Sequence, residues 1–165
     1  MDLTHARVAR ERDRVRADPA VVPLINETRD ALGDAFETDV DHVTPAQYRD
    51  AVDAVFADGD VAVNVAALAG LLRDLDVSDD YPGFVVDEIL GRELAATIAG
   101  GRPLSLLAEA TFHFADVQTH GDADDAAGDD DLRAALAAGF QTRLPGWDWT
   151  AAESPFAVEP PGDVE

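Results

Sequence analysis

The chain has 165 residues, of which 47% are hydrophobic, and a formal net charge of −22 from 34 carboxylates and 12 basic residues. It contains no cysteine, which excludes disulfides, zinc–thiolate sites, iron–sulfur clusters and thiol nucleophiles. No stretch approaches 18 consecutive apolar residues, and the amino terminus has no apolar segment typical of a signal peptide. We therefore expect a cytoplasmic protein without a membrane span.

All twelve basic residues are arginine, and aspartate outnumbers glutamate by 25 to 9. Such a chain repels itself strongly in dilute buffer, whereas in 1 M salt the Debye length falls to about 3 Å. The composition therefore indicates a protein of an extreme halophile, which keeps molar salt in its cytoplasm. In such a proteome, net charge reports the solvent and does not identify the binding partner.

Helix signals begin at the amino terminus. The run 2–17 contains neither proline nor glycine and is rich in alanine and arginine, which predicts a helix that Pro19 ends. A second helix is predicted over 23–32, with Gly33 as its carboxyl-terminal stop. The polar, acidic residues 33–43 are then expected to form a loop.

The dipeptide Thr44-Pro45 is typical of a helix start, and it predicts a helix over 45–57. Asp60 is expected to cap the next helix, which extends to about Leu75. Because residues 60–65 alternate between apolar and polar side chains, a short strand at that place remains an alternative.

Three further helices are predicted in the second half of the chain, over 84–99, 104–119 and 132–140. Asp131 is expected to cap the last of these helices. The stretch 121–131 carries six aspartates, and we expect it to be a solvated loop.

These signals favour an all-α fold, a single-domain bundle of about six or seven short amphipathic helices. Short connections between such helices favour antiparallel neighbours. Residues 1–150 are predicted to form the domain, and 151–165 an irregular, partly flexible carboxyl-terminal arm that contains three prolines.

The sharpest candidate site lies on the predicted helix 104–119. Glu109, His113, Asp116 and His120 are spaced by four, three and four residues, so they fall within an arc of about 60° on one helix face. Imidazoles and carboxylates one turn apart can bind a divalent ion together, and nitrogen with oxygen ligation suits zinc, iron, manganese or nickel. This stripe is the candidate metal site.

Two structural interpretations compete with a metal site, and the first is favoured. A helix packed on most of its surface leaves such a polar stripe facing water, and a polar network between helices has the same pattern. His120 in the last turn also interacts well with the helix carbonyl end. The spacing matches neither the HExxH motif of zinc proteases nor the paired ExxH motif of di-iron bundles.

Five arginines lie within ten positions of the first predicted helix, and three of them, Arg7, Arg10 and Arg14, share one face. Arginine pairs carboxylates through two hydrogen bonds and is weakly hydrated, so it functions at an interface even in salt. The favoured interpretation is that this helix crosses the acidic body of its own chain or of a second subunit. Solvent exposure and phosphate binding are the alternatives, although phosphate affinity falls steeply with salt.

Both tryptophans of the chain, Trp147 and Trp149, lie in one turn-rich segment after Pro145. The large rings are expected to anchor the carboxyl-terminal arm on the helical body. A partner-binding surface is the alternative, since tryptophan is enriched at interface hot spots.

No nucleophile–base pair, phosphate-binding glycine loop or cofactor motif is recognisable in the chain. We therefore expect a non-enzymatic helical interaction or regulatory protein that can form a homo-oligomer. A metal-binding protein or metal-dependent enzyme built on Glu109, His113, Asp116 and His120 is the first alternative. Nucleic-acid binding through the arginine-rich helix is the second, and it is unlikely.

Overall fold

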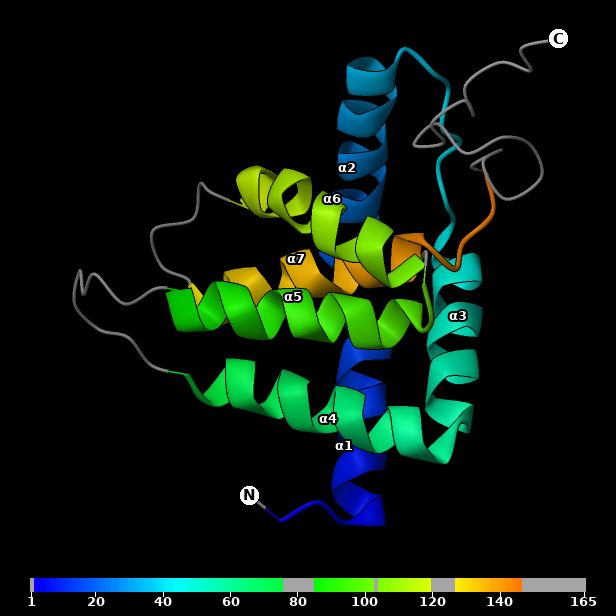
Figure 1. Cartoon of the computed structure of the whole chain (residues 1–165). Helices are drawn as coiled ribbons and strands as arrows, with labels where there is room; N and C mark the ends of the chain where they lie inside the picture. Colours follow the sequence, from blue (N-terminus) through cyan, green and yellow to red (C-terminus); the bar gives the residue numbers. More distant parts are fainter. Residues whose placement is uncertain (1, 76–84, 103, 120–126, 147–165) are drawn as a thin grey trace, which may run out of the picture.

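The computed structural model describes residues 2–75, 85–102, 104–119 and 127–146. Within these ranges the chain forms seven helices and no strand, which confirms the predicted all-α bundle (Figure 1). The helices are α1 (His5–Ala17), α2 (Val21–Phe36), α3 (Pro45–Ala57), α4 (Gly59–Asp74), α5 (Val85–Ala99), α6 (Leu104–Thr119) and α7 (Ala127–Gln141).

Helix α7 is the centre of the bundle. It packs against α5, α6, α2 and α4, and every side chain from Ala134 to Ala138 is fully buried. Helix α1 contacts α3 and α4 (Figure 1). Because four of those five α7 residues are alanines, the neighbouring helices can approach its backbone closely.

Two glycines lie where neighbouring helices approach each other closely. A Cβ atom at Gly139 of α7 would lie 2.8 Å from Cβ of Ile98, and one at Gly91 of α5 would lie 2.6 Å from the Phe112 ring. Both distances are shorter than van der Waals contact, so these positions require glycine for packing.

Replacing Gly139 with alanine is therefore expected to destabilise the protein by about 1–3 kcal/mol, because the added methyl group overpacks the contact between α5 and α7. Gly59 is the matched control, since it is also helical but has nothing within 4 Å of its Cβ position. Gly59→Ala should leave stability unchanged or raise it by up to about 1 kcal/mol through helix propensity. Urea titrations in molar KCl give both values, and equal effects would contradict this account of the packing.

Polar contacts, more than apolar ones, hold α1 on the bundle. Its only buried residues are Val15 and Glu11, and Oε1 of Glu11 lies 2.5 Å from Nε of Arg73 on α4. The hydroxyl of Tyr48 on α3 donates a 2.7 Å hydrogen bond to the Val15 carbonyl. Burial raises the pKa of the Tyr48 phenol above its usual value, so this group stays a hydrogen-bond donor.

Arg29 of α2 is fully buried, and its hydrogen-bond partners among the described residues are all carbonyls. Its Nη1 donates to the carbonyls of Asp41 and Pro145, both at 2.6 Å, and its Nη2 to those of Gln141 and Leu144 at 3.1 and 3.2 Å. Burial lowers its pKa to about 10, which still leaves the guanidinium charged at neutral pH. One side chain thus joins α2, the 37–44 connection and the end of α7.

The predicted end of α2 is wrong. Gly33 does not stop the helix, which continues to Phe36, so the expected loop over 33–43 begins only at Glu37. Glu37 adopts the left-handed conformation (φ 53°) that closes the helix. Gly33 is required instead because the Thr38 carbonyl oxygen would lie 2.7 Å from a Cβ at that position.

Two other expected boundaries are also corrected. The alternative strand over 60–65 is wrong, because these residues are helical and the side chain of Asp58, not Asp60, caps α4 through the Val61 amide at 3.3 Å. Helix α7 begins at Ala127, so Asp131 lies inside it, and the expected aspartate-rich loop ends before residue 127. Aspartate in a first helical turn is favoured by the helix dipole.

In the described part of the chain, no single helix is both long and apolar enough to cross a membrane. Only α3 and α4 counted together reach the length and composition of a span, and the two are bent by 110°.

Candidate interaction groove

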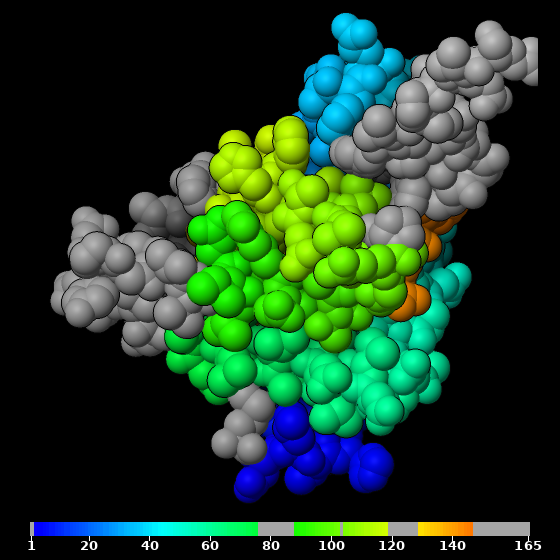
Figure 2. Space-filling model, viewed as in Figure 1, coloured from blue at the N-terminus to red at the C-terminus, as the bar shows by residue number. Residues whose placement is uncertain are grey.

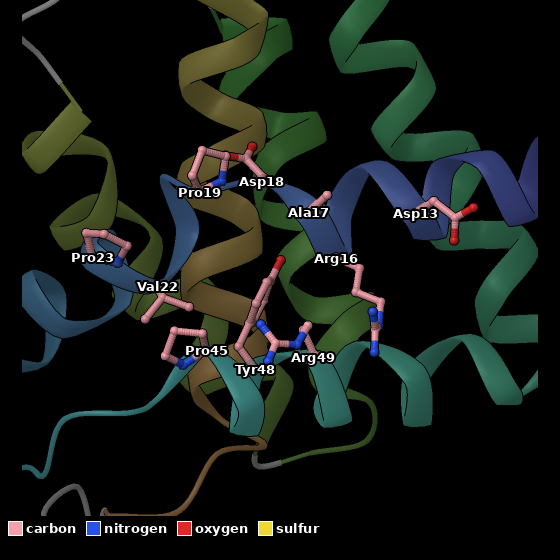
Figure 3. A pocket seen from close by; sticks show the side chains of 10 residues that line it. All are labelled: Asp13, Arg16, Ala17, Asp18, Pro19, Val22, Pro23, Pro45, Tyr48 and Arg49. Carbon is pink, nitrogen blue, oxygen red and sulfur yellow. The ribbon is translucent and has the colours of Figure 1, made fainter.

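An open groove of about 670 Å³ lies where α1 ends, α2 begins and α3 begins (Figure 3). Its walls are mostly apolar, and its rim carries two arginines from different helices. The lining residues are Asp13, Arg16, Ala17, Asp18, Pro19, Val22, Pro23, Pro45, Tyr48 and Arg49.

Prolines at the helix starts shape this groove. Pro45 is the first residue of α3, after the Thr44 cap, and Pro23 lies in the first turn of α2, where a missing amide hydrogen costs little. Pro19 stands in the short α1–α2 connection. Because proline carries no amide hydrogen and a fixed φ, these positions give the groove rigid apolar walls.

The floor of the groove is anchored in the core. Tyr48 is 2% exposed, and its ring meets Phe140 of α7 edge-on at a centroid distance of 5.5 Å. Asp18 accepts the Ala20 amide at 2.9 Å, and its other oxygen lies 3.6 Å from Nε of Arg133 on α7. The groove is therefore supported on both sides by fixed side chains.

The two rim arginines differ in whether they pair with a carboxylate among the described residues. Arg16 extends from α1 toward α3 and pairs with Asp53 at 3.0 Å, with both side chains about half exposed (Figure 3). Arg49 of α3 is exposed, and within the described residues it makes no hydrogen bond or ion pair. Its guanidinium borders the groove.

The predicted arginine face lies elsewhere on α1. Arg7 pairs with Asp74 of α4 at 3.9 Å, while Arg10 and Arg14 are exposed and have no ion-pair partner among the described residues. None of the three lines the groove. The pairs Arg7–Asp74 and Arg16–Asp53 lie within the chain, and the predicted interaction role of Arg7, Arg10 and Arg14, on this chain or on a second subunit, stays a prediction.

The predicted metal stripe is only partly described. His113 is exposed, Glu109 and Asp116 are half-buried, and His120 lies outside the described residues. Where the structure describes the chain, no three His, Asp or Glu side chains are grouped closely enough to hold a metal ion. The four-residue metal site therefore stays a prediction.

Trp147 and Trp149 also lie outside the described residues, so their predicted role as anchors or partner contacts stays a prediction. The described chain ends at Gly146, immediately before them, and this end is well fixed. The Asp41 amide donates to the Gly146 carbonyl at 3.0 Å, and Gly146 has a positive φ of 99°.

Sequence reasoning missed the groove and Arg49. Arg49 stands 33 residues after Arg16, and only the packing of α1 on α3 brings the two to one rim. The three prolines near helix starts were the available sequence signal for the groove, but the same prolines are equally typical of helix boundaries.

Comparison with known proteins adds a family but no function. No curated protein and no solved structure matches the chain. One family model matches residues 1–160, which is nearly the whole sequence. The chain therefore belongs to the family described as Domain of unknown function (DUF7984).

Proposed function

We propose that this protein is a non-enzymatic interaction module that binds an acidic segment of a partner protein in the α1–α3 groove. The observation that carries the proposal is the pair of arginines on the rim of an apolar groove, one of them without a partner among the described residues. The volume of about 670 Å³ is within the range of ligand-binding clefts.

The chemistry of the groove selects an acidic, partly apolar ligand. Apolar walls favour burial of an aliphatic or aromatic side chain, and a guanidinium binds a carboxylate through two parallel hydrogen bonds. The groove is open to solvent, so a peptide side chain can enter it. Asp13 and Asp18 also line the groove, so the carboxylate of the partner is expected to meet the two arginines and its apolar side chain the prolines.

The molar salt that the composition indicates also favours an acidic, partly apolar ligand. The lysine-free, aspartate-rich composition supports a cytoplasmic protein of an extreme halophile, where long-range attraction is screened within about 3 Å. Binding there depends on short-range contacts, which arginine provides better than lysine. High salt weakens phosphate binding more than this short-range binding, because affinity for nucleic acid falls steeply with salt.

Substitution of both rim arginines tests the proposal. We expect a fluorescent peptide of alternating leucine and aspartate to bind in about 2 M KCl, and Arg16→Gln with Arg49→Gln to weaken binding by about tenfold or more, as each lost bidentate contact reduces affinity. Fluorescence anisotropy measures this affinity. The matched control is Arg92→Gln with Arg102→Gln, two exposed arginines outside the groove, which should bind as the native chain does.

Three results would overturn the proposal. The first is no binding of the peptide, and the second is equal binding by the native chain and the groove variant. The third is a labelled DNA duplex that binds in the same salt and is released by the same two substitutions, which would assign the groove to nucleic acid. Circular dichroism checks that the variants fold. We expect them to fold, because an exposed pair such as Arg16–Asp53 contributes at most about 1 kcal/mol to stability.

A further inference from the structure

Helix α1 is attached to the bundle by an interface with little apolar burial. Val15 is its one buried apolar side chain, and the other buried residue of the helix is Glu11. An open pocket of about 230 Å³ lies between α1 and the junction of α3 with α4, lined by Val8, Phe56 and Ala62 among others. In the space-filling view the amino-terminal part of α1 (blue) projects beyond α4 (Figure 2). Few buried apolar contacts are typical of an element that opens more easily than the core.

Helix α1 also differs from the rest of the chain in the sign of its charge. It carries five arginines against two carboxylates, whereas the other residues carry seven arginines against 32 carboxylates. With histidine neutral, a helix of net charge +3 therefore lies on a body of net charge −25. Attraction between exposed opposite charges weakens as salt shortens the Debye length, and so does repulsion between like charges. Rising salt therefore weakens the docking of α1 while it stabilises the acidic body.

The ion pairs between α1 and its neighbours differ in how far salt can reach them. Two of them, Arg7–Asp74 at 3.9 Å and Arg16–Asp53 at 3.0 Å, have side chains that are 34% to 71% exposed. Exposed pairs of this kind are screened by salt, whereas buried pairs are screened much less. The carboxylate of Glu11, by contrast, is paired with α4 at a buried position. Helix α1 thus has salt-sensitive contacts at its surface and one contact inside that salt affects little.

We propose that α1 is an electrostatically docked helix, which rising KCl releases from α3 and α4 and which a ligand in the α1–α3 groove holds in place. The effect of the ligand rests on the proposed function, because α1 supplies Asp13, Arg16 and Ala17 to the groove wall. Release of α1 removes this wall, so the groove is complete only in the docked state. A ligand that binds the docked state alone shifts the population toward it.

The labelling rate of a buried thiol measures the release of α1, and the absence of native cysteine gives a clean background. Val15→Cys places the thiol in the α1 contact, and Ala135→Cys places one in α7, at positions that are both 0% exposed in the native chain. From about 1 M to about 4 M KCl, labelling by uncharged 4,4′-dithiodipyridine, relative to free 2-mercaptoethanol, should become about threefold faster at residue 15, as two exposed ion pairs are screened. At residue 135 it should stay equal or become slower.

Hydrogen exchange of the native chain gives the same comparison without any substitution. Followed by mass spectrometry and corrected for the intrinsic rate in each salt, exchange of the α1 amides should accelerate between about 1 M and about 4 M KCl, whereas exchange of the α7 amides should not. This measurement keeps the proposal testable if the cysteine at residue 15 disturbs folding.

Carboxylate substitutions separate the surface ion pairs from the general charge of the body. Asp53→Asn with Asp74→Asn removes the partners of two α1 arginines, so labelling of Val15→Cys at about 1 M KCl should become about threefold faster and less dependent on KCl. Asp34→Asn with Asp39→Asn is the matched control, since it removes the same charge from two exposed carboxylates that form no ion pair with α1. The control should leave labelling at residue 15 nearly unchanged.

The coupling between α1 and the groove is measured with the peptide of alternating leucine and aspartate. At about ten times its dissociation constant, this peptide should slow the labelling of Val15→Cys about tenfold, because it binds only the docked state. A peptide that does not bind would refute the proposed function, while the salt dependence of labelling without peptide would still test the docking of α1. The two proposals can therefore fail separately.

Any of three observations would contradict electrostatic docking of α1. Labelling that responds to KCl in the same way at residues 15 and 135 would show that α1 opens only together with the whole bundle. Equal labelling of the two aspartate double variants would show that the surface pairs do not hold the helix. A peptide that binds in the groove but leaves labelling at residue 15 unchanged would show that the groove does not require docked α1.

Discussion

Replacing Arg29 with methionine is expected to lower the free energy of unfolding by about 4 kcal/mol, a large part of the 5–15 kcal/mol typical of a domain. The substitution keeps the length of the side chain but leaves the buried carbonyls of Gln141 and Leu144 without the guanidinium donor they have now. Each buried acceptor left unpaired costs about 1–3 kcal/mol. Urea denaturation in molar KCl, followed by circular dichroism, measures the change.

Two further variants make this prediction specific. Arg29→Lys should fall between the native chain and Arg29→Met, because an ammonium group carries its charge at one point and cannot reproduce the planar fork that reaches four carbonyls. Arg102→Met, at an exposed arginine without an ion-pair partner among the described residues, should change stability by less than about 0.5 kcal/mol. An Arg29→Met protein as stable as Arg102→Met would contradict the anchoring role.

The second large effect is loss of helix when salt is removed. Lowering KCl from about 2 M to about 50 mM should reduce the helical circular dichroism signal, because the Debye length grows past about 10 Å below 0.1 M and repulsion among 34 carboxylates is no longer screened. The described ion pairs offset little of this repulsion, since most are exposed.

The acidic end of α2 provides the matched variant for this measurement. Asp34, Glu37 and Asp39 are exposed and close together around Gly33. Changing them to Asn, Gln and Asn should move the folding midpoint to lower KCl, whereas changing the exposed, uncharged Thr38 and Gln118, which cap no helix, to alanine should not. Equal helicity of the native chain at high and low salt would contradict the halophilic interpretation of the composition.

Local sequence signals were sufficient for most of the fold. The limits of α6 at Leu104 and Thr119 were predicted without error, and the Thr44 cap and Pro45 start of α3 are present as expected. These features depend on neighbours three or four residues away, so a window of sequence contains their causes. The wrong prediction that α2 ends at Gly33 has a cause outside such a window. That glycine is needed because the carbonyl of Thr38 packs against it after the chain has turned.

Less of the candidate sites than of the fold could be predicted from the sequence. The polar stripe through Glu109, His113 and Asp116 was recognised, but helical period alone does not say that His113 is exposed while Glu109 and Asp116 are half-buried. Likewise, Arg7, Arg10 and Arg14 were grouped by their shared face on α1. The packing of α1 on α3 and α4 instead joins Arg16 with Arg49 and separates that pair from the other three.

The sequence by itself determined the helical class of this protein and most helix limits, because propensity and capping are properties of single residues and their near neighbours, and its composition predicts a surface suited to molar salt. Tertiary structure alone decided that Arg29 binds carbonyls from 12 to 116 positions away and that Arg16 and Arg49 border one groove. Burial and pairing depend on which distant segments meet, and that information exists only once the helices have packed.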